Sequence, residues 1–222
     1  MQFPEWLVDR VVKRQGRLHP YPRFEARHTA FVVIDLQNYY TQPGFMAECA
    51  AARETFPAVN RLATALRAAG GCVVWVQTSS EGAEQFWSHH HRHMLTPERS
   101  ARRLRELAPS HEGYALAAGL EYRAQDLRVV KRSFSALTPG SSCLHEALRR
   151  RQIETLLIGG TATNVCCEST ARDAMMMDYP TIMVEDALSA MSQEEHVQAL
   201  SNWMLYFGDV LSVDETIARL AD

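Results

Sequence analysis

Three residues whose side chains can do hydrolytic chemistry stand at, or shortly after, the ends of apolar runs in this chain of 222 residues: Asp35, Lys131 and Cys166. A cysteine thiolate attacks carbonyl carbon, and a carboxylate can take the thiol proton and later activate water. An ammonium group beside both would lower the pKa of the thiol and keep the carboxylate ionised. The three residue types indicate a thiol hydrolase, although spacing alone does not bring such distant positions together.

Cys166 lies in a stretch that predicts a buried strand followed by a helix. Residues 155–158 are apolar or β-branched, and the two glycines that follow are expected to end the strand. Thr163 or Asn164 can cap the next helix, which places Cys166 in its first turn. A thiol there feels the positive end of the helix dipole and the free N–H groups. Both favour the thiolate, and the same N–H groups could bind an oxyanion.

The rest of the chain alternates strands with helices. Strands are expected at residues 29–35, 72–77, 127–131, 155–158, 180–186 and 208–213, and helices at 50–69, 99–107, 142–151, 193–207 and 214–220, besides the helix that holds Cys166. This alternation predicts a parallel sheet with right-handed crossovers and helices on both faces. We predict an α/β fold, a Rossmann-like three-layer α/β/α sandwich with a central, mainly parallel sheet in a single domain. Because the carboxyl ends of parallel strands share one rim, the three candidate residues can converge there.

Two segments fall outside the alternation. Residues 1–28 predict a partly helical N-terminal arm that packs on the domain of residues 29–222 or on a partner subunit. Residues 79–125 contain no clear strand and predict a rim insertion that serves as a lid or a subunit contact. The insertion holds a histidine cluster, His89, His90, His91 and His93. Clustered histidines without a paired carboxylate are weak evidence for a metal site, so a solvated or interface-lining loop is the favoured interpretation and no metal is expected.

The residues around the three candidates resemble a known family. Asp35 begins Asp-Leu-Gln, Lys131 follows a Val-Val pair, and Cys166 ends Gly-Thr-Ala-Thr-Asn-Val-Cys. Thr170 and Asp173 follow in Glu-Ser-Thr-Ala-Arg-Asp-Ala. This pattern resembles the isochorismatase-like cysteine hydrolases over roughly residues 28–215, and its wording is most similar to the branch of the ureidoacrylate and N-carbamoylsarcosine amidohydrolases.

The resemblance implies a catalytic triad of Asp35, Lys131 and Cys166 and no cofactor. It also implies a non-proline cis peptide between Thr161 and Ala162, with an oxyanion hole made by the N–H groups of Ala162 and Cys166. The implied reaction breaks a C–N bond of a small amide, carbamoyl or ureido substrate through a Cys acyl-enzyme, and ammonia or an amine leaves. Members of the family usually associate, so a homo-oligomer, a dimer or a tetramer, is expected.

Some features depart from other branches of the family. Nicotinamidases carry an Asp-x-His metal site after the second strand, where residues 77–80 here are Gln-Thr-Ser-Ser. Siderophore-pathway isochorismatases lack the cysteine that is present here. Gln37, Asn38, Trp87 and Arg132 are the candidate substrate contacts. A nicotinamidase-like enzyme, another small-amide or ester hydrolase and a non-catalytic small-molecule-binding protein of the same fold remain alternatives.

Composition excludes several other classes. Hydrophobic residues make up 46% and charged residues 22%, which is ordinary for a globular domain. The net charge of −3 argues against a nucleic-acid-binding protein, and the strand-sized apolar runs predict no membrane span. No Gly-x-Gly-x-x-Gly follows the first strand, which argues against a nucleotide-binding site. Five irregularly spaced cysteines, with no recognisable signal peptide, favour reduced thiols in the cytoplasm.

Overall fold

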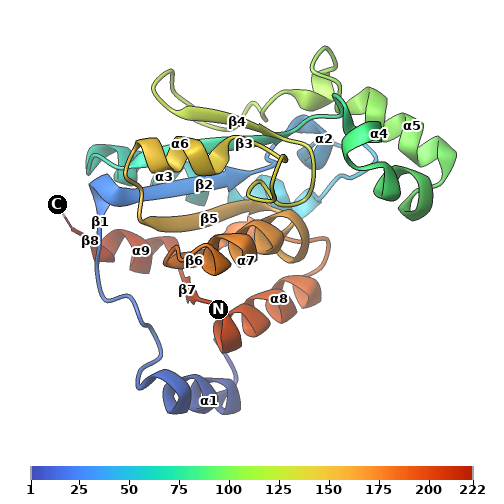
Figure 1. The fold of residues 1–222 in the computed structure, drawn as a ribbon. Helices are drawn as coiled ribbons and strands as arrows, with labels where there is room; N and C mark the ends of the chain where they lie inside the picture. The colour runs from blue at the N-terminus through green and yellow to red at the C-terminus, as the bar shows by residue number, and fades with distance from the viewer. Residues whose placement is uncertain (1, 222) are drawn as a thin grey trace.

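A computed structural model describes residues 2–221, and their centre is a six-stranded sheet (Figure 1). The strands are β2 (Thr29–Ile34), β3 (Cys72–Thr78), β4 (Leu127–Lys131), β5 (Thr155–Thr161), β6 (Thr181–Ser189) and β7 (Asp209–Leu211). All neighbouring strands are parallel, in the order β4-β3-β2-β5-β6-β7. The predicted three-layer α/β/α sandwich in a single domain is confirmed.

The burial of each strand follows from its place in the sheet. Every residue of the central strand β2 is buried, because helices cover both faces there. The edge strand β4 alternates instead, with Val129 buried and Val130 exposed. Since side chains in a strand alternate between the two faces, Lys131 shares the buried face with Val129. The alternation of β4 therefore directs this lysine into the protein and not into solvent.

The strand that leads to Cys166 is longer than the sequence predicts. The expectation that Gly159 and Gly160 end it is wrong, since β5 runs through both glycines to Thr161. The two glycines pair with Val33 and Ile34 of β2. Gly160 has a φ of +113°, and a Cβ atom on it would lie 2.0 Å from the carbonyl oxygen of Ile34. Glycine is required there because the two backbones approach too closely for a side chain.

Helices cover both faces of the sheet (Figure 1). One face is covered by α3 (Phe56–Ala68) and α9 (Val213–Arg219), and the other by α6 (Leu144–Arg150), α7 (Glu168–Met176) and α8 (Gln193–Tyr206). Phe31 and Val33 of β2 pack with the first group, whereas Val32 and Ile34 pack with the second. The two alternating faces of one strand thus belong to two separate cores.

The N-terminal arm packs on the domain of its own chain. Helix α1 (Glu5–Gln15) buries Leu7 and Val11 fully, in the same core as α8. The short strand β1 (Phe24–Glu25) pairs in parallel with β8 (Leu220–Ala221), and a 3-10 turn, η1 (Ala26–His28), leads into β2. The arm therefore contacts the domain at both of its ends.

The insertion of residues 79–125 projects past the carboxyl end of the sheet (Figure 1). It contains α4 (Ala83–Phe86), a π-helical turn η3 (His90–Met94), α5 (Pro97–Glu106) and a 3-10 turn η4 (Glu112–Tyr114). Before it in the chain, α2 (Asn38–Thr41) and the 3-10 helix η2 (Ala50–Thr55) follow β2. An antiparallel bridge between Gln37 and Leu116 ties the insertion to the end of β2. As predicted, the described residues of the insertion form no strand of the sheet.

The strand order reverses between β2 and β5. From β2 the chain adds β3 and β4 on one side, then returns to add β5, β6 and β7 on the other. Open α/β sheets bind their ligands at such a switch point, at the carboxyl ends of the strands. Asp35 and Cys166 follow the two strands that flank the reversal. Among residues 2–221, no helix is long and apolar enough to cross a membrane.

Candidate active site

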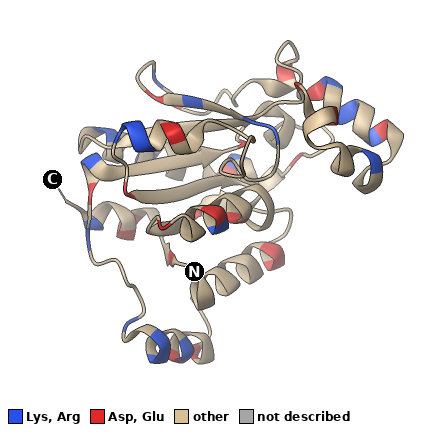
Figure 2. Cartoon of the chain, viewed as in Figure 1, with Lys and Arg blue, Asp and Glu red and all other residues tan. Residues whose placement is uncertain are grey.

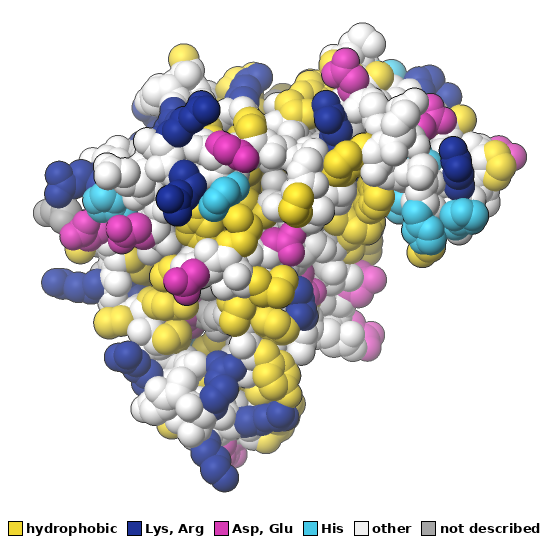
Figure 3. Space-filling model, viewed as in Figure 1, with side chains coloured by type: hydrophobic (Ala, Val, Ile, Leu, Met, Phe, Trp, Pro, Cys, Tyr) yellow, Lys and Arg dark blue, Asp and Glu magenta, His cyan; other side chains and the backbone are white. Residues whose placement is uncertain are grey.

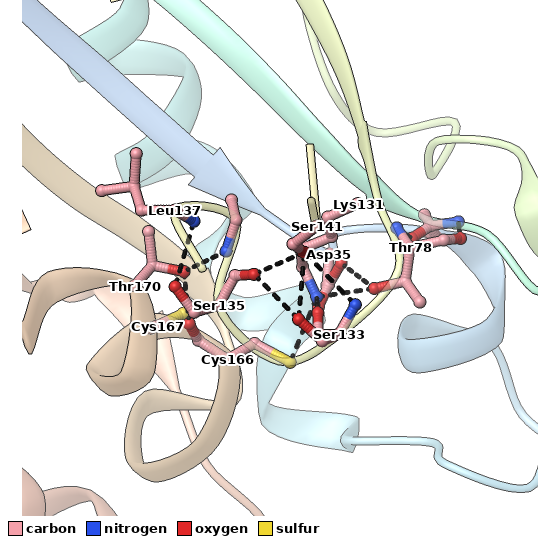
Figure 4. Close-up of polar contacts among 12 residues, drawn as sticks. Asp35, Thr78, Lys131, Ser133, Ser135, Leu137, Ser141, Cys166, Cys167 and Thr170 are labelled. Carbon is pink, nitrogen blue, oxygen red and sulfur yellow. Dashed lines mark hydrogen bonds and ion pairs between the residues drawn. The ribbon is translucent and has the colours of Figure 1, made fainter. Parts of the chain in front are cut away.

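Asp35, Lys131 and Cys166 converge at the switch point (Figure 4). The Nζ atom of Lys131 lies 2.8 Å from Oδ2 of Asp35 and 3.5 Å from Sγ of Cys166. Asp35 and Lys131 are fully buried, and the Cys166 residue is 4% exposed. A buried carboxylate, ammonium and thiol in contact are a set that can perform nucleophilic acyl transfer.

Thr78, at the end of β3, connects the two charged groups. Its hydroxyl donates to Oδ1 of Asp35 at 2.8 Å and accepts from Nζ of Lys131 at 2.7 Å. The ammonium group also donates to the carbonyl oxygen of Ser133 at 3.0 Å. Because β3 lies between β2 and β4, Thr78 bridges the gap that the lysine side chain must span. Sequence analysis did not identify Thr78 as a site residue, because nothing in its local pattern shows that its hydroxyl meets both charged groups.

The backbone of Asp35 is unusual. Its φ is +58°, the left-handed region that few residues other than glycine adopt, although aspartate tolerates it better than most. Its N–H donates to the carbonyl oxygen of Val76 at 2.9 Å, which continues the pairing of β2 with β3. The chain therefore turns at the carboxylate itself, between the end of the strand and α2.

Cys166 lies in a π-helical turn, η5 (Thr163–Cys167), that precedes α7. The expected cap is absent: neither Thr163 nor Asn164 caps this turn, and the hydroxyl of Thr163 instead hydrogen-bonds Nδ1 of His196 at 2.8 Å. The Thr161–Ala162 peptide is cis, as the family resemblance implies. Among the described residues, the N–H of Ala162 donates to no hydrogen bond.

Burial disfavours the thiolate form of Cys166. Burial raises its pKa from an ordinary 9.0 to about 12, the Asp35 carboxylate adds to the rise, and Lys131 opposes it. Loss of solvation therefore opposes the thiolate form that the turn and the Lys131 ammonium are expected to favour. Burial would lower the pKa of Lys131, but the charge of Asp35 and its contact with the ammonium raise this pKa above its ordinary value.

A chain of hydroxyl groups joins the loop after β4 to α7 (Figure 4). Ser133 donates to Oγ of Ser141, which in turn donates to the carbonyl oxygen of Ser135. Ser135 donates to Asp173 of α7 at 2.6 Å. Thr170 accepts from the N–H of Ala136 and donates to the carbonyl oxygen of Cys166 at 2.8 Å. Thr170 and Asp173 thus join the loop that follows Lys131 to helix α7, which follows Cys166.

Two of the candidate substrate contacts have partners within the protein. The buried amide of Gln37 donates to the carbonyl oxygens of Thr78 and Tyr114 and accepts from the N–H of Thr78 at 2.7 Å. Asn38 donates to the carbonyl oxygen of Glu112 at 2.9 Å. Both side chains therefore join the insertion to the end of the sheet.

The other two candidates, Trp87 and Arg132, line two different cavities. Trp87 stacks on His90 with ring centroids 4.0 Å apart and meets Phe134 edge-on. Trp87 lines a cavity together with Ser133 and Ser135, which lie in the loop after β4. Arg132 is exposed and lines a separate cavity, because it points away from the face that Lys131 occupies. The structure does not bring Arg132 to the cysteine.

The histidine cluster contributes packing contacts within the insertion, at whose outer end Figure 3 shows the histidine side chains. His90 stacks on Trp87, and Nδ1 of His91 lies 2.9 Å from the hydroxyl of Ser100. Burial, together with the charges of Arg103 and the neighbouring histidines, lowers the pKa of His90 to about 4. Within residues 2–221, no three His, Cys, Asp or Glu side chains are grouped to hold a metal.

Comparisons with known proteins agree with this fold and this motif. The chain is 31% identical over 212 residues to ureidoacrylate amidohydrolase RutB from Variovorax paradoxus (strain S110), a match that covers 88% of this chain and 82% of that protein. A cysteine hydrolase from Pseudomonas syringae pv. phaseolicola 1448A has the same fold, with a TM-score of 0.76 at 23% identity over 88% of this chain and 93% of its own. The N-carbamoylsarcosine amidase from Thermoplasma acidophilum also has it, with a TM-score of 0.64 at 22% identity over 84% and 96%.

The fold and the position of the site define a three-layer α/β hydrolase. The isochorismatase domain model matches residues 29–215. This chain belongs to the isochorismatase family, as its motifs predict.

Proposed function

We propose that the chain is a cysteine amidohydrolase that breaks the C–N bond of a small amide, carbamoyl or ureido substrate. The observation that carries the proposal is the buried contact between Lys131, Asp35 and Cys166. The names of two relatives support the substrate class, since one is a ureidoacrylate amidohydrolase and the other an N-carbamoylsarcosine amidase. Hydrolysis of an amide-type C–N bond is consistent with the names of both relatives.

In the proposed first half-reaction, Asp35 takes the thiol proton as Sγ of Cys166 attacks the carbonyl carbon. The N–H groups of Ala162 and Cys166 stabilise the resulting oxyanion. The C–N bond then breaks, and Asp35 returns the proton to the leaving nitrogen. Lys131 stays charged throughout, because its contacts with Asp35 and Thr78 hold the ammonium in place.

In the second half-reaction, water attacks the acyl or carbamoyl group on the sulfur. Asp35 removes a proton from this water, and the proton then returns to the sulfur as the C–S bond breaks. Burial raises the pKa of the resting thiol, so in this mechanism Asp35 must receive the thiol proton while the sulfur attacks. The proposed mechanism uses no metal or cofactor.

The test is ammonia release from ureidoacrylate, N-carbamoyl amino acids, nicotinamide and aliphatic amides, with and without a chelator. Cys166→Ala should abolish release, whereas Cys143→Ala should not, because Cys143 is an exposed thiol. The best substrate of the native protein would define the substrate class. Undiminished release by Cys166→Ala would refute the proposed nucleophile, and loss on chelation would contradict a metal-free reaction.

We further propose that the enzyme works as a homo-oligomer, a dimer or a tetramer, in the cytoplasm. Apolar side chains gather on the surface over α7, α8 and α1 (Figure 3). Among them, Met176 is 70% exposed and Trp6 is 58% exposed. Burial of such a surface between copies would be favourable. Light scattering measures the mass in solution, and a monomer of 25.1 kDa would contradict the oligomer.

A further inference from the structure

A cavity of about 380 Å³ lies at the edge of the sheet opposite to the candidate active site. Its lining residues precede or begin strands β2, β3, β4 and β5, so it is at the amino ends of these strands. Basic residues precede β2 and end α6 at this edge (Figure 2). Cys72 begins β3 here, and Thr78 ends the same strand beside Lys131. Strand β3 spans about 20 Å, which separates the cavity from the reacting groups.

Three arginines line this cavity, each from a segment that leads into a strand. Arg27 belongs to η1, Arg67 to the last turn of α3, and Arg151 follows α6 directly. The side chain of Arg27 lies along the turn before β3, since a Cβ atom on Gly70 would be 3.4 Å from its Cγ. The fold thus brings three positive charges, distant in sequence, to one cavity.

The carboxylate of Asp126 is too fully engaged to balance all three arginines. It is the only carboxylate among the described residues that line the cavity. Its oxygens accept from Nε and Nη2 of Arg67 at 2.9 and 2.6 Å, from Nε1 of Trp75 at 2.8 Å and from the N–H of Arg123 at 2.8 Å. Because a carboxylate has about four acceptor positions, none is left for the other two arginines of the cavity.

The three guanidinium groups therefore have unused hydrogen-bond donors. Within residues 2–221, neither Arg27 nor Arg151 forms an ion pair or a hydrogen bond through its side chain. The side chain of Arg67 is only 9% exposed, yet its Nη1 is buried and has no hydrogen-bond partner. Buried polar groups in native proteins are nearly always paired, and a charged group costs the most to leave unpaired. The unused donors point to an anionic ligand.

The surplus charge fits a phosphate group better than a carboxylate. Three arginines and one aspartate line the cavity, which leaves two positive charges without a partner. A phosphate monoester carries about 1.5 to 2 negative charges at pH 7 and has three acceptor oxygens, which planar guanidinium groups bind in pairs. A carboxylate would neutralise only one charge. The volume of about 380 Å³ lies in the range of small-molecule sites, so there is room for more than the phosphate group.

We propose that Arg27, Arg67 and Arg151 form a binding site for the phosphate group of a small molecule, separate from the candidate active site. The site does not depend on the proposed hydrolysis, because none of the reacting groups lines this cavity. Cys72 lines it and is only partly buried, so its thiol can report whether the site is occupied. Burial raises the pKa of this thiol and Arg151 opposes the rise, so the guanidinium acts on the sulfur.

The first test measures how fast iodoacetamide alkylates Cys72, by peptide mass spectrometry, with inorganic phosphate, glycerol 3-phosphate or acetate at equal ionic strength. Both phosphates should slow the reaction about tenfold at saturation, because the bound group covers the thiol and opposes its ionisation. The exposed Cys143 lies outside the cavity and should react at an unchanged rate. Protection by glycerol 3-phosphate alone would assign the site to an organic phosphate. Equal protection by acetate, or none by either phosphate, would overturn the proposal.

The second test measures binding of glycerol 3-phosphate by calorimetry, with thermal unfolding to check each variant. Arg27→Ala and Arg151→Ala should each weaken binding about tenfold or more, since a hydrogen bond between charged groups contributes on that scale. Arg151→Lys keeps the charge without the planar fork and should bind with intermediate affinity. Arg150→Ala, which removes an exposed arginine of α6 outside the cavity, should bind as the native protein does. Equal losses in Arg150→Ala and Arg151→Ala would show a general attraction for anions and would overturn the site.

Discussion

The contact of Lys131 with Asp35 and Cys166 places a buried charge pair against a buried thiol. The charges of Lys131 and Asp35 neutralise each other. Their contact also holds the Asp35 carboxylate in a fixed position, where it can accept the thiol proton. Thr78 holds the carboxylate and the ammonium at once, so the geometry does not depend on the substrate. Pre-organisation of this kind removes the cost of arranging the groups during the reaction.

Replacement of the proposed base tests this arrangement. Asp35→Asn should lower kcat by about 10²-fold or more, because the amide cannot take the thiol proton. Asparagine tolerates the φ of +58° at this position and can still accept from Thr78, so the fold should survive. Steady-state kinetics give kcat, and thermal unfolding checks the fold. A folded Asp35→Asn protein with native kcat would rule out Asp35 as the base.

The protonation of the thiol has a consequence for stability. The folded pKa of Cys166 is raised from 9.0 to about 12, so the folded state holds this proton more tightly than the unfolded chain does. The corresponding stabilisation is complete below pH 9.0 and is lost as the pH rises toward about 12. Over this range the native protein should therefore lose unfolding free energy relative to Cys166→Ala. Thiolate absorbance from Cys166 at neutral pH would show that the thiol is ionised, and this result would contradict the raised pKa.

At the scale of elements, strand β5 positions both the cis peptide and the cysteine turn. The sequence correctly predicted a strand before Cys166, because the apolar run is a local signal. It could not predict that Gly159 and Gly160 stay in the strand, since that depends on the backbone of β2 pressing against Gly160. The missing cap has a similar cause: Thr163 turns to His196, 33 residues away in the chain.

Gly160→Ala tests this close approach. The new Cβ would lie 2.0 Å from the carbonyl oxygen of Ile34 and would occupy a left-handed backbone position, so we expect a loss of at least about 3 kcal/mol in unfolding free energy. Gly16→Ala is a matched control, because Gly16 has a φ of +80° but nothing within 4 Å of its added Cβ. Chemical denaturation gives both values. Similar small losses for the two variants would show that the contact with β2 is not decisive.

At the scale of the whole molecule, the sheet and the insertion meet at the candidate site, where Gln37 hydrogen-bonds both. The sheet brings Asp35, Lys131 and Cys166 together, and this convergence could be predicted because parallel strands share one rim. The insertion was recognised as a segment without strands, but the position of Arg103 beside Tyr39 could not be predicted. Such a contact arises from how a long irregular segment packs, for which the chain has no periodic signal. Arg132 was misplaced for a local reason, the alternation that sends it away from Lys131.

The N-terminal arm should matter for stability and not for chemistry. Leu7 is fully buried between α1 and α8, far along the chain from the reacting groups. Leu7→Ala should lower the unfolding free energy by about 2–5 kcal/mol through a lost contact and a cavity, with kcat unchanged. Denaturant titration and steady-state kinetics measure the two effects. A lower kcat in the folded variant would link the arm to the active site.

The central claim is that Cys166 forms a covalent bond with the carbonyl carbon of the substrate. The direct measurement is mass spectrometry of the cysteine peptide after acid quenching of the native enzyme during turnover of its best substrate. Covalent catalysis by Cys166 predicts an acyl or carbamoyl adduct on Cys166, and none on Cys143 or in the Cys166→Ala protein. Turnover that persists in Cys166→Ala, with no adduct on the native peptide, would contradict it.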